Sequence, residues 1–191
     1  MGLLTFKGGI HPNDGKSLAK DKAIVTVMPK GDLIYPLSQH IGAPASPIVS
    51  VGDHVLKGQK IAEAGGFVSA PIHASVSGTV KAIEPHFNPT GSKVNCIVVE
   101  NDGEYQEVPY APAKPFDELT KEAILNLISE AGIVGMGGAG FPTKVKLSPK
   151  EPEKIEYVIA NCAECEPYIT ADYRRMLENP EELVSGMKVV L

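Results

Sequence analysis

Short apolar runs separated by Gly, Pro and Asp fill the first half of the chain and predict a small all-β domain. The runs occupy positions 23–28, 33–36, 47–51, 55–62, 78–83 and 95–100. Closely spaced short strands with turn residues between them are typical of a barrel or a sandwich. Gly52-Asp53 and Lys57-Gly58 predict tight turns between strands. The thin core of this domain is expected to contain Val55, Ile61, Val76, Val80 and Ile83.

Beyond position 115 the apolar period lengthens to that of a helix. Apolar residues recur at positions 123, 124, 127, 128 and 131. Thr120 is suited to cap the amino end of this helix, and Gly132 is suited to the left-handed position that ends it. The second half of the chain therefore begins with a helix and predicts a different domain class from the first half.

The last part of the chain predicts one strand and two helices. Positions 155–160 read as a buried strand, and positions 168–177 read as a helix. A further helix has Asn179 as its cap, Pro180 at its first position and Glu182 closing a capping box. Because this helix runs to Leu191, we expect the sequence to end inside a larger domain.

Composition excludes several functional classes. With 191 residues the chain has room for one large domain or two small ones. Its net charge of −5, without a basic stripe, argues against nucleic acid as the main ligand. There is no apolar run long enough to span a bilayer and no signal-like leader, so any membrane association is expected to be through a partner. The 3 cysteines suit a reducing cytoplasm better than a disulfide framework.

A glycine-rich stretch at 132–146 is the strongest candidate for chemistry. Five glycines fall within positions 132–140. Such density lets the backbone approach a charged ligand closely, which favours a phosphate or nucleotide cradle. A loop that merely turns the chain remains the alternative, and the flanking residues must decide between them.

The stretch Asn161-Cys-Ala-Glu-Cys-Glu-Pro167 follows the predicted strand and supplies two carboxylates, Glu164 and Glu166. Ligands of open α/β sheets bind where strands end, and carboxylates there can accept hydrogen bonds from ribose hydroxyls or a carboxamide. Solvated carboxylates at a turn are the alternative. Cys162 and Cys165 form a C-x-x-C, which suits a redox dithiol or half of a zinc site, but the helix-start context of thioredoxin-like sites is missing.

Two family resemblances follow from these motifs. Segments 51–63 and 69–83 resemble the biotinyl/lipoyl-like barrel-sandwich family. In carrier members the connecting hairpin presents a modified lysine, whereas the connection 64–71 here contains none. The domain is therefore expected to be an interaction or positioning module. Its histidines, His54, His73 and His86, lack metal-ligand spacing and are expected to be exposed or hydrogen-bonded.

The second resemblance covers essentially the whole chain. Gly135-x-Gly-Gly-Ala-Gly-Phe-Pro-Thr-x-x-Lys146 followed by Asn161-x-x-Glu-x-Glu-Pro167 resembles the FMN- and NADH-binding region shared by the flavoprotein of respiratory complex I and the RnfC component of Rnf electron-transport complexes. The opening motif at 6–12 and the amino-terminal barrel favour the RnfC family. Ala163 stands where complex I relatives have an acidic residue, so one flavin contact of those relatives is absent.

The resemblance assigns roles to nine residues. It implies that the loop glycines let the backbone pass the flavin and its phosphate, that Lys146 meets the phosphate and that Phe141 stacks on the dinucleotide. Asn161 would hydrogen-bond the flavin, Glu164 would lie near it and Glu166 would receive NADH. The expected FMN and NAD(H) contacts are thus Gly135, Gly137, Gly138, Gly140, Phe141, Lys146, Asn161, Glu164 and Glu166.

The resulting hypothesis is an α+β, two-domain fragment of an RnfC-type protein. It would comprise an arm (1–21), an all-β barrel-sandwich hybrid (22–101), a proline linker (102–115) and the first part of an α/β FMN- and NADH-binding domain (116–191). Hydride transfer between NADH and FMN would deliver electrons to 4Fe-4S clusters. Only three cysteines are present, so those clusters are expected outside this sequence, and the fragment alone is expected to be inactive.

The resemblance also implies partners and a location. The whole subunit would act peripherally at the cytoplasmic face of a bacterial cell membrane, with other subunits of the redox complex and, indirectly, ferredoxin. The coupling ion, Na⁺ or H⁺, stays open. A cobalamin reductase of bacterial microcompartments is one alternative function, and a noncatalytic barrel-sandwich adaptor is another.

Overall fold

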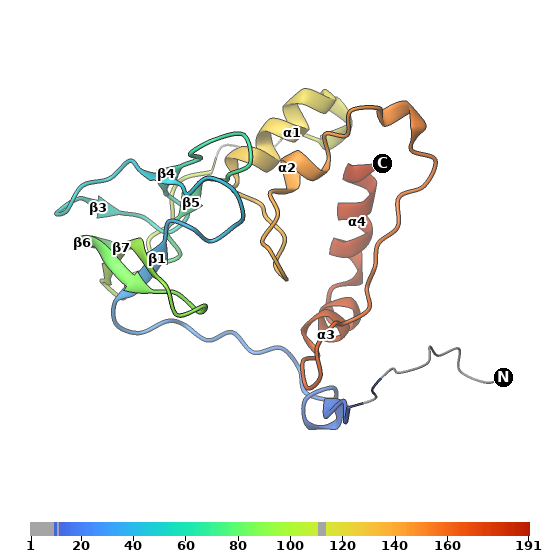
Figure 1. The fold of residues 1–191 in the computed structure, drawn as a ribbon, viewed down its shortest axis with the longest axis horizontal. Helices are drawn as coiled ribbons and strands as arrows, with labels where there is room; N and C mark the ends of the chain where they lie inside the picture. Colours follow the sequence, from blue (N-terminus) through green and yellow to red (C-terminus); the bar gives the residue numbers. More distant parts are fainter. Residues whose placement is uncertain (1–9, 11, 111–113) are drawn as a thin grey trace. The chain divides into compact units, whose positions relative to one another are not determined.

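The computed structural model describes residues 10, 12–110 and 114–191 of the chain, and Figure 1 shows its elements. The chain divides into two compact units. The barrel unit is Met28–Lys154, and the arm unit combines Met1–Val27 with Ile155–Leu191. Most of the predicted opening motif at 6–12 and the middle of the predicted linker, 111–113, lie outside the described residues. Each unit is described by itself, and the domain boundaries given above stay a prediction.

Two antiparallel sheets form the β part of the barrel unit. One sheet has the order β1-β7-β6-β3, and the other has the order β2-β4-β5. The strands are β1 (Leu33–Pro36), β2 (Ser46–Pro47), β3 (His54–Val55), β4 (Lys60–Glu63), β5 (Ile72–His73), β6 (Gly78–Phe87) and β7 (Lys93–Asn101). The long β6–β7 hairpin forms the centre of the first sheet, because β1 pairs with β7 and β3 pairs with β6.

A compact apolar core lies between these strands. Its fully buried side chains include Val55, Ile61, Val76, Val80, Ile97 and Val99, all with 0% exposure. Four of the five predicted core residues are therefore confirmed. Ile83 is the exception: it pairs with the buried Ile97 of β7 but is itself 37% exposed.

The strand predictions are confirmed where a partner strand exists. Positions 33–36, 78–83 and 95–100 lie in β1, β6 and β7, whereas the predicted run 55–62 is divided into β3 and β4 by a turn at Gly58, which has φ +84°. The predicted strand 47–51 is reduced to β2. The predicted strand 23–28 is wrong: the run forms no strand, and Val27 is 80% exposed.

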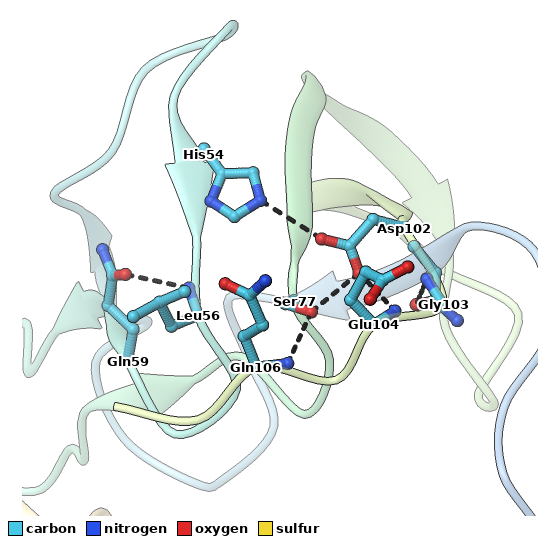
Figure 2. Close-up of polar contacts among 9 residues, drawn as sticks. His54, Leu56, Gln59, Ser77, Asp102, Gly103, Glu104 and Gln106 are labelled. Atoms are coloured by element: carbon cyan, nitrogen blue, oxygen red, sulfur yellow. Dashed lines mark hydrogen bonds and ion pairs between the residues drawn. The ribbon is translucent and has the colours of Figure 1, made fainter. Parts of the chain in front are cut away.

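Polar contacts join β3 and the residue before β6 to the segment after β7, as Figure 2 shows. The Asp102 carboxylate accepts a hydrogen bond from Ser77 Oγ at 2.7 Å and lies 3.2 Å from His54 Nε2. Ser77 Oγ also accepts the amide N–H of Gln106 at 2.9 Å. Because the carboxylate lies between the imidazole and the hydroxyl, the imidazole is not placed to take the serine proton, so the group is a structural network rather than a hydrolytic triad. The first part of the predicted linker is thereby held against the barrel.

Two helices complete the barrel unit and lie side by side (Figure 1). They are α1 (Lys121–Glu130) and α2 (Thr143–Lys146), with 3₁₀ turns η2 (Phe116–Glu118) before them and η3 (Pro152–Lys154) after them. The predicted cap is confirmed, because Thr120 Oγ1 accepts the amide N–H of Ala123 at 3.2 Å. The predicted stop is confirmed as well, with Gly132 at φ +66°.

The arm unit contains the 3₁₀ turn η1 (Lys16–Leu18) and two helices, α3 (Ala171–Glu178) and α4 (Pro180–Val190). Pro180 takes the first position of α4, as predicted. The predicted capping box is wrong, because the Asn179 side chain makes no capping hydrogen bond. The predicted strand at 155–160 is also wrong. No strand forms there, and Tyr157 and Ile159 are 81% and 84% exposed, since no described strand pairs with the segment. None of the helices in the described part of the chain is long and apolar enough to cross a bilayer.

Candidate functional site

The glycine-rich loop is a tight hairpin between α1 and α2. Val134 pairs with Pro142, the Gly135 amide donates to the Phe141 carbonyl at 2.9 Å, and the Thr143 amide donates to the Ile133 carbonyl at 3.0 Å. Gly132 lets the chain leave α1 in a left-handed conformation, as the sequence predicts. The tip of the hairpin, 136–139, is thus held by its own stem.

The hairpin is attached to the barrel at two glycines. The Ile41 amide donates to the Ala139 carbonyl at 3.0 Å. Next to this bond, a Cβ on Gly140 would lie 2.9 Å from the Gln39 carbonyl oxygen, and its φ is +59°. At the hairpin base, a Cβ on Gly132 would lie 2.5 Å from the Pro71 carbonyl oxygen. Close backbone approach to the barrel therefore explains Gly132 and Gly140 without any ligand.

The other three glycines of the loop have no close contact with the barrel. A Cβ on Gly137 or on Gly138 would meet no atom within 4 Å, and Gly138 has φ +57°. Gly135 faces the hairpin partner strand, because its Cβ would lie 3.4 Å from the Phe141 amide nitrogen. The exposed backbone of Gly137 and Gly138 is the part of the loop where a bulky ligand can approach without a clash.

A cavity of about 480 Å³ opens beside the attached side of the hairpin. It is lined by residues of the loop after β1, of the β6–β7 turn and of the hairpin tip, namely Pro36, Ser38, Gln39, His40, Ile41, Asn88, Pro89, Thr90, Gly138 and Ala139. The His40 ring is buried and occupied with the backbone, since Nε2 accepts the Ala70 amide at 3.1 Å and Nδ1 lies 2.9 Å from the Ile41 carbonyl. The cavity is therefore lined both by the hairpin tip and by loops of the barrel.

Ion pairing holds α1 to the barrel below the hairpin. Lys60 Nζ lies 2.5 Å from Glu130 Oε2 and 3.0 Å from Glu63 Oε1. The Lys60 hydrogen bond holds the pKa of Glu130 below its usual range. Burial, followed by the nearby Lys60 charge, lowers the pKa of His73. The carboxyl end of α1, where the glycine loop begins, is therefore held to the barrel by an ion pair as well as by packing.

Two predicted site residues follow the hairpin tip. Phe141 is partly exposed, and Lys146 is an exposed residue at the end of α2. The neighbouring Lys144 Nζ lies 3.3 Å from Asn126 Oδ1, so it is partly engaged with α1. Lys146 is thus the α2 lysine presented to solvent, although its predicted phosphate contact stays a prediction.

The acidic motif belongs to the arm unit. Asn161 is exposed, and its Oδ1 accepts the Ala163 amide at 3.0 Å, forming a local turn. Glu164 Oε1 accepts the Asp172 amide at 3.0 Å at the start of α3. Glu164 Oε2 is buried and has no hydrogen-bond partner within the described chain. A buried carboxylate oxygen without a partner is unfavourable, so this atom is suited to accept a hydrogen bond from a bound group.

Glu166 differs from Glu164 in its surroundings. Its side chain is exposed, while its backbone carbonyl accepts a hydrogen bond from Lys16 Nζ at 3.1 Å. The sequence does not reveal this contact, because the two residues are 150 positions apart. The structure thus brings together Asn161, Glu164 and Glu166 in one unit and the loop glycines with Phe141 and Lys146 in the other.

The cysteines form no cluster. Cys96 is buried in β7, Cys162 is half-buried and Cys165 is exposed, all as free thiols. Over residues 10, 12–110 and 114–191, no group of three or more His, Cys, Asp or Glu side chains is arranged to hold a metal ion.

Sequence comparison gives two family matches that divide the chain. Residues 4–104 match the RnfC barrel sandwich hybrid domain, and residues 128–191 match the Nuo51 FMN-binding domain. The barrel-sandwich prediction and its position before the FMN-binding domain are therefore confirmed.

Curated relatives agree with these matches. The RnfC protein of a proton-translocating ferredoxin:NAD⁺ oxidoreductase complex from Clostridium ljungdahlii is 47% identical over 99% of this chain and 42% of its own length. A counterpart from the Na⁺-translocating complex of Acetobacterium woodii is 43% identical over 98% of this chain and 42% of its own length. The corresponding protein of an ion-translocating oxidoreductase complex from Vibrio cholerae is 42% identical over 98% of this chain and 24% of its own length.

The chain thus spans less than half the length of these relatives. The barrel-first order and the names of the relatives decide against the cobalamin-reductase alternative. The chain belongs to the RnfC family, whose members are subunits of ion-translocating ferredoxin:NAD⁺ oxidoreductase complexes.

Proposed function

We propose that this chain forms the flavin- and NADH-binding part of an electron-input subunit. The whole subunit would pass electrons between NADH and ferredoxin within an ion-translocating complex, at the cytoplasmic face of the membrane. The family match to an FMN-binding domain over 128–191 and the names of the relatives support this proposal. The 4Fe-4S clusters and the other subunits are expected in the whole complex and not in this sequence.

The observation that carries the proposal is that some glycines of the loop contact the barrel closely whereas others do not. Gly132 and Gly140 serve attachment to the barrel, whereas Gly137 and Gly138 leave open backbone at the tip. Turning the chain accounts for Gly138, whose φ is +57°, but not for Gly137, where φ is not in the left-handed region and a Cβ would meet no atom within 4 Å. An open glycine pair on a rigid support is suited to a flat or phosphorylated ligand.

The residues present fit a flavin nucleotide in kind. Gly135, Gly137 and Gly138 would face it with backbone, Gly140 would keep the loop docked, and Lys146 would meet its phosphate as a point charge. Asn161 and Glu164 would supply polar contacts, and the partnerless Glu164 Oε2 is suited to accept a hydrogen bond from a flavin N–H.

The nicotinamide nucleotide requires a second set of contacts. Glu166 has an exposed carboxylate that would accept hydroxyl or amide hydrogen bonds, and Phe141 would offer a ring face. When bound, FMN supplies the chemistry that links two-electron transfer to single-electron transfer. The chain's own task is to orient both nucleotides and exclude competing contacts.

The test uses the full-length subunit loaded with FMN. Lys146→Ala is expected to weaken FMN binding roughly ten- to a hundredfold, because a hydrogen bond to a charged group contributes about 1.5–3 kcal/mol. Lys144→Ala, in the same helix, is the matched control and is expected to bind FMN normally. Glu166→Gln is expected to keep FMN but lose NADH-dependent flavin bleaching. Unchanged bleaching in both Lys146→Ala and Glu166→Gln contradicts the site assignment.

The adaptor alternative predicts a different result. If the barrel only docks onto a partner, neither FMN nor NADH raises the thermal midpoint of the full-length subunit. A ligand present at a hundred times its Kd stabilises a native protein by about 2.7 kcal/mol, which a thermal melt detects readily.

A further inference from the structure

The arm unit contains a polar clamp that grips the acidic motif from the amino-terminal segment. Lys16 Nζ donates to the Glu166 carbonyl at 3.1 Å and to the Ile169 carbonyl at 2.7 Å. Two carbonyls three residues apart are thus bridged by a single ammonium group. The bridge fixes the direction in which the chain leaves Glu166.

Backbone contacts reinforce the Lys16 bridge. The Tyr168 amide donates to the Asp14 carbonyl at 2.5 Å. Gly15, at φ +59°, lies under the Tyr168 ring so closely that a Cβ would approach ring carbons to 2.2 Å. Tyr168 itself has φ +68°, a conformation that residues other than glycine rarely adopt. A strained residue persists only where its surroundings hold it, and here the surroundings are Asp14, Gly15 and Lys16.

The arm is also fastened beyond the clamp. The Lys20 carbonyl accepts a hydrogen bond from Arg174 at 3.1 Å, and the Ile24 amide donates to the Glu178 carboxylate at 3.0 Å. Arg174 and Glu178 are one turn apart on α3 and bond each other. The clamp is therefore one end of a contact that follows the whole of α3.

Glu164 is anchored by different partners. Its Oε1 accepts the Asp172 amide, which belongs to α3 and not to the amino-terminal segment. Asn161 is likewise held by its own local turn. Among the three predicted site residues of the arm unit, Glu166 is thus the one whose backbone depends on the amino-terminal segment.

We propose that Lys16 is a positioning residue that sets the orientation of Glu166 toward the nicotinamide nucleotide. The inference rests on the proposed function, since Glu166 is the predicted NADH contact. Lys16 acts through the Glu166 and Ile169 carbonyls and need not touch the ligand. The clamp separates control of NADH binding from control of flavin binding, because Glu164 and Asn161 have their own supports.

The kinetic test compares three variants of the FMN-loaded, full-length subunit. Lys16→Met keeps the side-chain length but removes the donor, and is expected to raise the KM for NADH about tenfold with kcat within about twofold and FMN affinity unchanged. Lys16→Arg retains donors for both carbonyls and is expected to recover most of the loss. Lys22→Met, in the same segment, is the matched control. A KM unchanged in Lys16→Met overturns the proposal, and so does an equal loss of FMN affinity.

A second measurement is independent of any ligand. Amide hydrogen exchange at Tyr168 is expected to accelerate in Lys16→Met and in Gly15→Ala, whereas the Asp172 amide, held by Glu164, is expected to stay protected. Unchanged exchange at Tyr168 overturns the clamp. A wild-type subunit that fails to react with NADH contradicts the proposed function instead, and faster Tyr168 exchange in the variants still supports the grip of Lys16 on the motif.

Discussion

The barrel unit and the arm unit hold their functional segments by opposite means. In the barrel unit, the glycine loop stands on a core of fully buried side chains and is attached to it by backbone contacts. In the segment 155–191 of the arm unit, Thr170 is the sole buried residue in the described structure. There the acidic motif is held by hydrogen bonds and ion pairs. Apolar burial specifies the first segment, whereas polar contacts specify the second.

This difference has a consequence for the two halves of the predicted site. Packing energy grows with buried apolar area and resists changes of pH. Exposed polar contacts contribute little individually and respond to pH and salt. The loop glycines are therefore expected to keep their arrangement under conditions in which Glu166 moves.

The largest expected effect tests the source of stability in each unit. Ile61→Ala removes a fully buried side chain and is expected to lower the free energy of unfolding of the barrel by about 2–5 kcal/mol. Leu183→Ala, at a 40% exposed position of α4, is expected to cost at most about 1 kcal/mol. Urea unfolding of the chain, followed by NMR signals of β7 and α4 amides, measures both. Equal losses in the two units contradict the comparison.

The next effect tests whether the glycine loop belongs with the barrel. Gly140→Ala places a Cβ at positive φ and 2.9 Å from a barrel carbonyl, and is expected to cost about 1–3 kcal/mol. Gly137→Ala meets no atom within 4 Å and is expected to change stability by about 0.5 kcal/mol or less. The same urea titration measures the two variants. A loop independent of the barrel would tolerate both substitutions alike.

Acid is expected to weaken each unit through a separate carboxylate. The Ser77 hydroxyl, with the Glu104 amide and His54, lowers the pKa of Asp102, while Arg174 and the Ile24 amide lower the pKa of Glu178. A carboxylate whose folded pKa lies below its unfolded value contributes stability that is complete above the unfolded pKa and is lost as the pH falls through the folded pKa. Acidification below about pH 4 is therefore expected to destabilise both units.

Two substitutions separate these contributions. Asp102→Asn is expected to weaken the acid dependence of barrel unfolding without changing how acid affects the contact between Ile24 and Glu178 in the arm unit. Glu178→Gln is expected to weaken the acid dependence of that contact and to leave barrel unfolding unchanged. Amide exchange at Val99 and at Ile24 against pH reports the two units. Identical pH profiles for the two variants would show that the carboxylates act on one cooperative structure.

The smallest expected effect concerns the ion pair under the glycine loop. Lys60→Met is expected to cost roughly 1 kcal/mol or less, because partly exposed ion pairs contribute little. The substitution is also expected to raise the pKa of His73, since the Lys60 charge is one cause of its lowered value, but burial is expected to keep that pKa below the usual range. An NMR titration of the His73 ring measures this shift, with Lys57→Met as the control. A His73 pKa that does not move contradicts the assigned role of Lys60.

Local signals in the sequence determined much of this protein. Turn glycines such as Gly52 and Gly58, the Thr120 cap and the Gly132 stop require only near neighbours, and all four lie where the sequence predicts them. Four of the five predicted core residues are buried, and three of these four lie in strands. The family motifs are likewise contiguous, and the family matches confirm the fold that they imply.

The failed predictions concern segments whose state depends on distant partners. Positions 23–28 and 155–160 have the apolar composition of strands, yet a strand exists only where another strand pairs with it, and neither segment has one among the described residues. Ile83 is 37% exposed although it pairs with the buried Ile97, so whether other residues cover it depends on the tertiary structure. Composition does not encode either event.

The sequence by itself thus determined the family, the two motifs and the residue types of a nucleotide site. Only the tertiary structure decided which contacts several residues of these motifs make within the chain. It separated the docking glycines, Gly132 and Gly140, from the open pair at the tip, and it joined Lys16 to Glu166 across 150 positions. Contacts between residues so far apart depend on how the chain closes in space, which no local pattern records.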